Sequence, residues 1–177
     1  FNGGVEQQVA IRYQYEDFRA NLIGRGVAGF KKLKTIDEQS GIVTETEYLQ
    51  SFPYMGYPLK TTQKLSNGAM LSEATNTWAQ RTIGNQVFAY LDLSVDKKWT
   101  LGSDSTPSDL TNNPQMFINQ VRTRNTYGDN YGNLTRIEVF NTSSQADDGS
   151  GGSEWFKTVT VNDYGTSVYE QKYARLK

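Results

Sequence analysis

Apolar and polar residues alternate with a period of two along much of this chain. In residues 9–15 the larger side chains occupy every second position, at Val9, Ile11, Tyr13 and Tyr15. This alternation is typical of a strand with one face buried and the other solvated. No long segment has a convincing helical period, so the pattern favours strands almost throughout.

Segments with this strand pattern are separated by short runs rich in glycine, asparagine, aspartate or proline. They are residues 9–15, 30–37, 42–52, 60–65, 69–79, 86–99, 115–127, 134–140, 155–164 and 167–176. Their spacing predicts an all-β fold, an antiparallel meander of about nine or ten strands built from hairpins. The segment 167–176 also fits a short helix.

The runs between these segments predict particular connections. Residues 16–29 break the alternation and contain three glycines, so we expect a connection, and 52–59 should form a rigid aromatic corner. Asn67 and Gly68 are expected to supply the positive φ angles of a tight hairpin turn. In 86–99 one side of the strand should carry Val87, Ala89, Leu91, Leu93 and Val95.

The segment 129–140, "DNYGNLTRIEVF", is a marked turn followed by a strand. Asp129 and Asn130 can bond to nearby backbone groups, and Gly132 or Asn133 can adopt the positive φ of the turn. Such a unit extends a sheet without any reactive side chain. Abundant threonine and tyrosine predict a sheet wetted on at least one face.

Composition and charge exclude several classes of function. The 177 residues suffice for one domain, and residues 1–177 are treated as a single β-rich segment with 100–114 as its candidate internal seam. Eighteen basic and nineteen acidic residues give a net charge of −1, which does not favour nucleic acid. No apolar run is long enough to span a bilayer. The first residue is Phe1, from which we expect a soluble piece of a longer polypeptide.

The chain contains no cysteine and no histidine. Disulfides, thiolate zinc sites, cysteine nucleophiles and a Ser-His-Asp triad are therefore ruled out within it. Histidine is also the usual general base near neutral pH. We therefore expect no enzyme, and we assign no catalytic, cofactor-binding or metal-binding residue and no cofactor.

Carboxylates are the remaining candidates for chemistry. They gather in two stretches, Asp92, Asp96, Asp104 and Asp109, and then Asp147, Asp148 and Glu154. A glycosidase needs two carboxyls at a fixed separation, which the sequence does not indicate, so these acids are interpreted as solvated. The second group could surround a calcium ion, and the sequence leaves calcium binding by loops 100–114 and 141–154 undecided.

Two further patterns have a structural and a functional interpretation. The run "GRGVAG" at 24–29 lacks the Lys-Ser/Thr pair and the helix of a phosphate-binding loop, so we reject a nucleotide site. A series of aromatic residues could form a sugar-stacking platform, but the edge of a core is the favoured interpretation. The series comprises Tyr13, Tyr15, Phe18, Phe30, Tyr48, Phe52, Tyr54 and Tyr57.

Four stretches of the chain, 13–30, 48–63, 127–140 and 155–164, carry short motifs that include Gly-Arg-Gly at 24–26, Phe-Pro at 52–53 and Gly-Asn-Leu-Thr at 132–135. In this order they resemble large bacterial YD-repeat (Rhs-type) proteins. Residues 13–30 are similar to a stretch near the junction with their SpvB-like, FG-GAP-bearing region, which the B components of insecticidal Tc toxins also carry. Residues 48–63 resemble the segment that follows it, 127–140 the core of a YD repeat, and 155–164 its next strand. The chain departs from the family in having one such repeat, with Gly128 inside its Tyr-Asp pair.

This resemblance implies a structural role in a secreted or cell-surface bacterial protein. YD-repeat strands in such proteins wind into a hollow shell around a C-terminal toxin domain. The implied partners are the rest of the parent chain, namely an upstream FG-GAP/SpvB-like region and downstream YD repeats, and the toxin domain. The acidic self-cleavage motif of the family is absent, so no catalytic residue is carried over. A segment of the shell wall (a wall segment) that is isolated from its parent chain would expose sheet edges and could self-associate.

The alternative prediction is a binding module, an adhesin-like or carbohydrate-contacting β domain. It would use exposed tyrosines together with Trp78, Trp99 or Trp155. Such a module should be closed and monodisperse, whereas a wall segment should have open edges.

Overall fold

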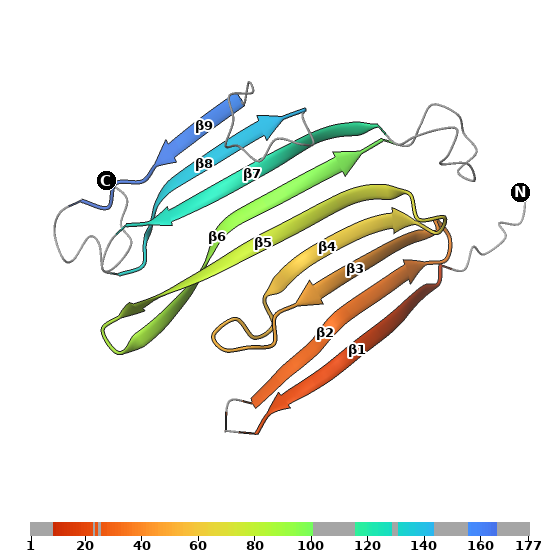
Figure 1. Cartoon of the computed structure of the whole chain (residues 1–177), viewed down its shortest axis with the longest axis horizontal. Coiled ribbons are helices and arrows are strands. Elements are labelled where there is room, and N and C mark those ends of the chain that lie inside the picture. Colours follow the sequence, from red (N-terminus) through yellow and green to blue (C-terminus); the bar gives the residue numbers. More distant parts are fainter. Residues whose placement is uncertain are drawn as a thin grey trace, which may run out of the picture.

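A computed structural model describes residues 9–22, 24, 26–100, 116–128, 131–143 and 156–165. Every regular element within these ranges is a β-strand, as Figure 1 shows. The all-β antiparallel meander predicted from the hydrophobic pattern is confirmed. The predicted strand at 167–176 and most of loops 100–114 and 141–154 lie outside the described residues.

Nine strands form one sheet in which sequence neighbours are also spatial neighbours, in the order β1 to β9. Their bounds are β1 Ile11–Asn21, β2 Gly26–Asp37, β3 Ile42–Tyr48, β4 Pro58–Leu65, β5 Met70–Ile83, β6 Gln86–Trp99, β7 Phe117–Tyr127, β8 Leu134–Thr142 and β9 Phe156–Val161. All eight pairings are antiparallel. Contacts along this meander are local in sequence, because each strand meets the one before it.

The β1–β2 hairpin is longer than the sequence predicted. Residues 16–29 were expected to form a connection, but β1 continues to Asn21 and β2 already begins at Gly26. The prediction was wrong because irregularities interrupt the alternation without ending the pairing. Asp17 has a φ of 53°, and the register shifts between Arg19 and Ala20. Such irregularities add residues and bend a strand while the ladder continues.

The β4–β5 turn lies where Asn67 and Gly68 predicted it, although its geometry differs. Only Gly68 has a positive φ, of 91°. The Asn67 side chain instead accepts a hydrogen bond from the Ala69 backbone N–H at 3.0 Å. An asparagine can thus stabilise a turn through its side chain as well as through its backbone.

The prediction that the apolar residues of β6 all lie on one side of the strand was wrong. The register with β5 shifts between Thr77 and Trp78, so that Leu93 lies opposite Thr77 and Leu91 lies opposite Trp78. Thr77 and Trp78 are adjacent and therefore point to opposite faces of the sheet. The leucines that lie opposite them must then point to opposite faces too. The alternation of apolar and polar residues in β6 does not indicate this register shift.

The register defines two faces of the sheet near its N-terminal edge. One, the aromatic face, carries Tyr15, Leu33, Thr46 and Thr61 at paired positions. The other, the charged face, carries Glu16, Lys32, Glu47 and Lys60 at the next paired positions. Strand alternation therefore separates ring-bearing and charge-bearing positions within β1.

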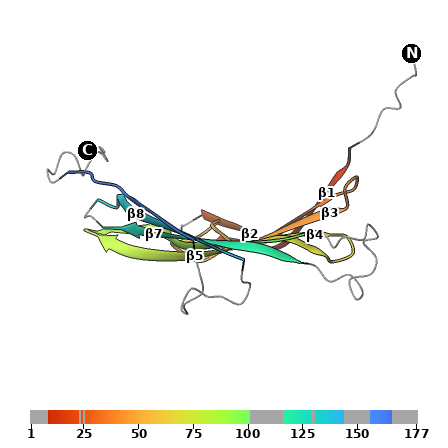
Figure 2. The same cartoon turned by 90° about the horizontal axis from the view of Figure 1, so that it is seen from above.

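The sheet is a single layer, as the edge-on view in Figure 2 shows. The buried apolar residues of the described part are Ala28 and Ala69, and no large side chain there is fully buried. Every residue of β9 is exposed, as are the first ten residues of β1. A domain of this size normally buries a contiguous core between two layers, and the described residues do not form one.

Candidate functional site

An exposed row of aromatic side chains runs along β1 and β2 on the aromatic face. The rings of Tyr13 and Tyr15 are nearly parallel, with an interplanar angle of 12° and centroids 6.5 Å apart. The Phe30 ring lies 4.8 Å from that of Tyr15 and 5.0 Å from that of Phe18. The kink at Asp17 therefore leaves Phe18 in contact with the same row. We call Ile11, Tyr13, Tyr15, Phe18 and Phe30 the β1 stripe.

The β1 stripe corrects the expectation that these aromatic residues form the edge of a core. Tyr13, Tyr15 and Phe18 are each more than half exposed, at 54%, 54% and 56%. Phe30 and Phe52 are exposed too, whereas Tyr48, Tyr54 and Tyr57 are half-buried. Periodicity assigned Tyr13 and Tyr15 to one face correctly, but a second layer was needed to bury them. A continuous exposed apolar row is unusual for a surface that stays in water alone.

The outer edge of β1 has backbone groups that no described strand pairs. Glu38 N–H donates to the Ala10 carbonyl at 3.0 Å, so residues 10 and 38 form a hydrogen-bonded pair. Antiparallel ladders alternate, so the backbone groups of Arg12, Gln14 and Glu16 also point toward β2. Those of Ile11, Tyr13 and Tyr15 therefore point outward. This edge is a template for another strand.

Arg12 and Glu16 of β1 lie on the face opposite Tyr13 and Tyr15. Arg12 forms an ion pair with Glu38 at 2.6 Å, and Glu16 lies 3.9 Å from Lys32. Lys32 also contacts Glu45 at 3.3 Å. The Glu45 hydrogen bond and charge raise the pKa of Lys32 above its ordinary value. Arg12 and Glu16 thus present opposite charges on the same side of the edge strand.

Gln50 attaches the loop after β3 to the β1–β2 hairpin. Its amide nitrogen donates to the Asp17 carbonyl at 2.7 Å and to the Gly29 carbonyl at 2.9 Å. Sequence reasoning missed this role, because both acceptors are more than twenty residues away along the chain. The contact fixes the kink that separates the regular part of β1 from its distal end.

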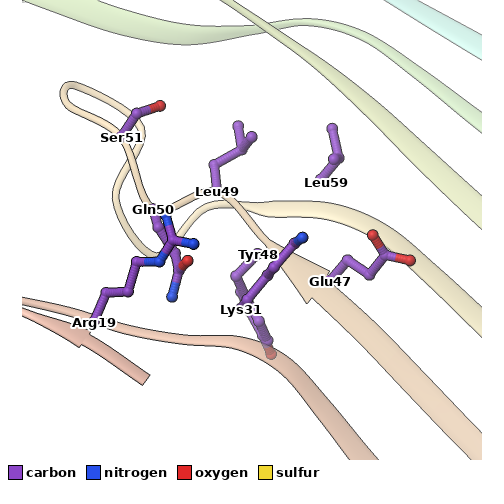
Figure 3. A pocket seen from close by; sticks show the side chains of 8 residues that line it. All are labelled: Arg19, Lys31, Glu47, Tyr48, Leu49, Gln50, Ser51 and Leu59. Carbon is purple, nitrogen blue, oxygen red and sulfur yellow. The ribbon is translucent and has the colours of Figure 1, made fainter. Parts of the chain in front are cut away.

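A hollow of about 270 Å³ lies beside Gln50, as Figure 3 shows. Its lining residues are Arg19, Lys31, Glu47, Tyr48, Leu49, Gln50, Ser51 and Leu59. Arg19 is already paired with Asp17 at 3.1 Å, and Arg19, Lys31 and Ser51 are exposed. Small-molecule sites usually enclose most of their ligand in an apolar pocket with converging polar groups. This hollow is small and its two cations are solvated, so it does not define a ligand.

A second aromatic cluster secures the far end of the β5–β6 hairpin. The ring of Tyr127 lies 5.5 Å from that of Phe88 and 4.8 Å from that of Tyr90. The Arg81 guanidinium lies over the Phe88 ring at 5.7 Å and donates to the Tyr127 carbonyl at 2.6 Å. Burial raises the pKa of the Tyr127 hydroxyl, with a smaller contribution from Tyr90. Sequence reasoning missed Arg81, whose partner is in β7.

The turn before β8 uses glycines where a side chain would not fit. Of the two residues expected to adopt a positive φ, Gly132 or Asn133, it is Gly132 that does so, at 81°, and an added Cβ there would lie 3.2 Å from the Phe88 ring. At Gly128 an added Cβ would lie 2.7 Å from the Thr135 Oγ1 atom, which itself bonds to the Thr126 carbonyl at 3.1 Å. The residue that departs from the YD-repeat pattern is therefore in a crowded position. Asp129 and Asn130 lie outside the described residues.

The 52–59 corner packs on the sheet through one tyrosine. The Tyr57 ring lies 4.4 Å from the Trp78 ring and 6.5 Å from that of Tyr54. The Trp78 indole nitrogen donates to the Pro58 carbonyl at 2.9 Å. Trp78 is thus engaged in packing rather than displayed for a ligand. Trp99 contacts Phe117 at 5.7 Å, and Trp155 lies outside the described residues.

At the opposite edge of the sheet, an ion pair joins a carboxylate of β8 to the edge strand β9. Glu138 accepts from Lys157 at 2.7 Å and from Arg136 at 3.0 Å. These two hydrogen bonds lower the pKa of Glu138 below its ordinary value. Phe156 and Val161 are 83% and 67% exposed. This edge therefore also leaves apolar side chains open to solvent.

The acidic residues singled out as candidates do not form a site in the described part of the chain. Asp92 and Asp96 lie on β6, and no group of three or more potential metal ligands occurs among the residues described. Five of the candidates lie outside them, namely Asp104, Asp109, Asp147, Asp148 and Glu154. No helix there has the length and apolar character of a membrane span.

Comparison of the chain with protein-family models, with curated proteins and with solved structures finds no match. We therefore infer function from the chain's own geometry and from its sequence motifs.

Proposed function

We propose that this chain is a wall segment of a larger β-sheet protein, of the YD-repeat shell type that its motifs resemble. The observation that carries the proposal is the single-layer sheet in which all of β9 and the first ten residues of β1 are exposed. A sheet with so few buried side chains gains little from the hydrophobic effect on its own. Further strands or a covering layer would supply the missing burial.

The arrangement of the strands supports this role. Each hairpin adds one antiparallel neighbour, so a meander of this kind can grow at β1 or at β9 without rearrangement. The turn at Gly132 and the tether from Arg81 to Tyr127 stabilise one such addition. We propose that the parent protein is secreted or at the bacterial cell surface, and that its shell encloses or displays a toxin region.

The chain's own residues would contribute no catalysis in this role. The chain would act through backbone pairing between neighbouring strands, and its main partner would be the rest of the parent chain. The aromatic face or the charged face would then meet the interior of the shell.

The nearly parallel Tyr13 and Tyr15 rings favour a second candidate, a carbohydrate-contacting module. Exposed aromatic rings can stack on the apolar face of a ligand. The sequence favoured burial of these two rings at the edge of a core, but both are exposed. Against this candidate, Trp78 and Tyr57 pack on each other and are half-buried.

Light scattering on the 177-residue chain, paired with a glycan array, tests the two candidates. A wall segment has open edges through which it can self-associate, and it should show no specific glycan signal. A monodisperse monomer that binds a defined glycan through the β1 stripe would contradict the wall proposal. The parent reading frame gives an independent test, because further Tyr-Asp…Gly repeats should follow this segment.

A further inference from the structure

We infer that the β1 edge pairs with β1 of a second copy of this chain, in an antiparallel register centred on Gln14. The occupant is thus a symmetric copy, and the pairing joins two sheets into one. This inference does not depend on the wall function, since it requires only that the β1 edge is not paired with another strand, as is the case among the described residues.

The backbone permits this register. Ile11, Tyr13 and Tyr15 direct their backbone groups outward, as the Glu38–Ala10 hydrogen bond shows. Centring the pair on Gln14 places Tyr13 opposite Tyr15 of the second copy, and Tyr15 opposite its Tyr13. Both are then hydrogen-bonded pairs, each exchanging two backbone bonds.

The charges select this register over its neighbours. Centring on Gln14 places Arg12 opposite Glu16 of the second copy, twice by symmetry. These are non-hydrogen-bonded pairs, in which side chains approach most closely. Centring on Tyr13 would place Arg12 opposite Gln14, and centring on Arg12 would place two arginines together. Arg12 and Glu16 are 62% and 63% exposed, so both remain accessible despite their contacts with Glu38 and Lys32.

The same pairing also brings the aromatic residues of the two copies together. A two-fold axis perpendicular to the sheet keeps the rings of both copies on one side, so the two β1 stripes become one band. Tyrosine pairs across antiparallel strands are among the favourable cross-strand contacts. The kink at Asp17, whose carbonyl is already bound by Gln50, ends the regular pairing. The interface is therefore short, and a dissociation constant in the micromolar range or weaker is expected.

Charge reversal provides the test, by sedimentation of the full 177-residue chain over a range of concentrations. Arg12→Glu and Glu16→Arg should each raise the dimer dissociation constant about tenfold, because both symmetric pairs become like-charged. The double variant should recover the original constant. An equimolar mixture of the two single variants should also recover it, as a heterodimer. Lys98→Glu, an exposed charge reversal on central β6, should have no effect.

Disulfide trapping gives a second, independent measurement. The natural chain has no cysteine, so Gln14→Cys introduces a single thiol on the proposed two-fold axis. Cα atoms in non-hydrogen-bonded pairs are close enough for a disulfide. This variant should oxidise to a covalent dimer, whereas Val159→Cys on β9 should not.

Three results would overturn the inference. The chain could remain monomeric at high micromolar concentration, the dimer could be insensitive to both charge reversals, or the double variant could fail to restore it. Trapping at Val159→Cys instead of Gln14→Cys would assign the interface to β9. If a charge variant does not fold, as judged by circular dichroism, the trapping result still decides. A monomer would leave the wall proposal standing, since a strand of the parent chain could occupy the same edge.

Discussion

The guanidinium of Arg81 in β5 donates a hydrogen bond to the backbone carbonyl of Tyr127 at the end of β7, at 2.6 Å. The two residues are 46 positions apart, and β6 lies between their strands in the sheet. The contact links the β5–β6 hairpin to the next one. In a single-layer sheet with little core, such a tether should contribute more to local order than it would in a layered domain.

Arg81→Ala should lower the free energy of unfolding by about 1.5–3 kcal/mol, the range for a hydrogen bond to a charged group. The loss should concentrate in β6 and β7, so hydrogen exchange there should accelerate. Urea denaturation and exchange mass spectrometry measure the two effects. Lys98→Ala, on the same sheet but exposed, should change stability by less than about 0.5 kcal/mol. Equal exchange in both variants would contradict the tether.

Gly132→Ala should destabilise the chain more than Gly84→Ala. Both glycines have positive φ, 81° and 61°, so both variants incur a backbone cost of about 1–2 kcal/mol. Only at Gly132 does the new Cβ also approach the Phe88 ring, whereas Gly84 has open space. Combining Gly132→Ala with Phe88→Ala should therefore cost less than the sum of the two changes. Urea denaturation measures all four, and strict additivity would refute the contact.

Trp78→Phe should cost about 1 kcal/mol, because it removes the indole hydrogen bond to Pro58 but retains a ring beside Tyr57. The cost is limited because Asn76 also donates to the Pro58 carbonyl, at 3.0 Å. Adding Asn76→Ala should leave that carbonyl without either donor and should destabilise the corner further. Urea denaturation of the two variants measures this difference, and no added loss in the double variant would contradict it.

Acid should weaken the attachment of β9. The pKa of Glu138 is lowered in the folded chain by Lys157 and Arg136, so its contribution is complete above the ordinary glutamate pKa of 4.5. That contribution is lost as the pH falls through the lowered folded value. Amide protection in β8 and β9 should therefore decrease in this window. Glu138→Gln should reduce the pH dependence of amide protection in β8 and β9, while Asp96→Asn on β6 should not. An unchanged profile in Glu138→Gln would contradict this assignment.

The sequence by itself determined the strands, their order and the all-β class, because the period-two alternation and the glycine- and asparagine-bearing turns are local signals. The turn at Gly132 was predicted for the same reason. Local signals did not reveal that β1 continues through residue 17, or that a register shift separates Leu91 from Leu93. Both depend on the neighbouring strand.

Only the tertiary structure decided which apolar residues are buried. Tyr13 and Tyr15 have the alternating pattern of a core-facing row, yet no described layer covers them or the neighbouring Phe18. Periodicity reports which side chains share a face, and it says nothing of what lies against that face. The contacts of Gln50 and Arg81 depended on the fold for the same reason, since their partners are brought close only when distant strands pair.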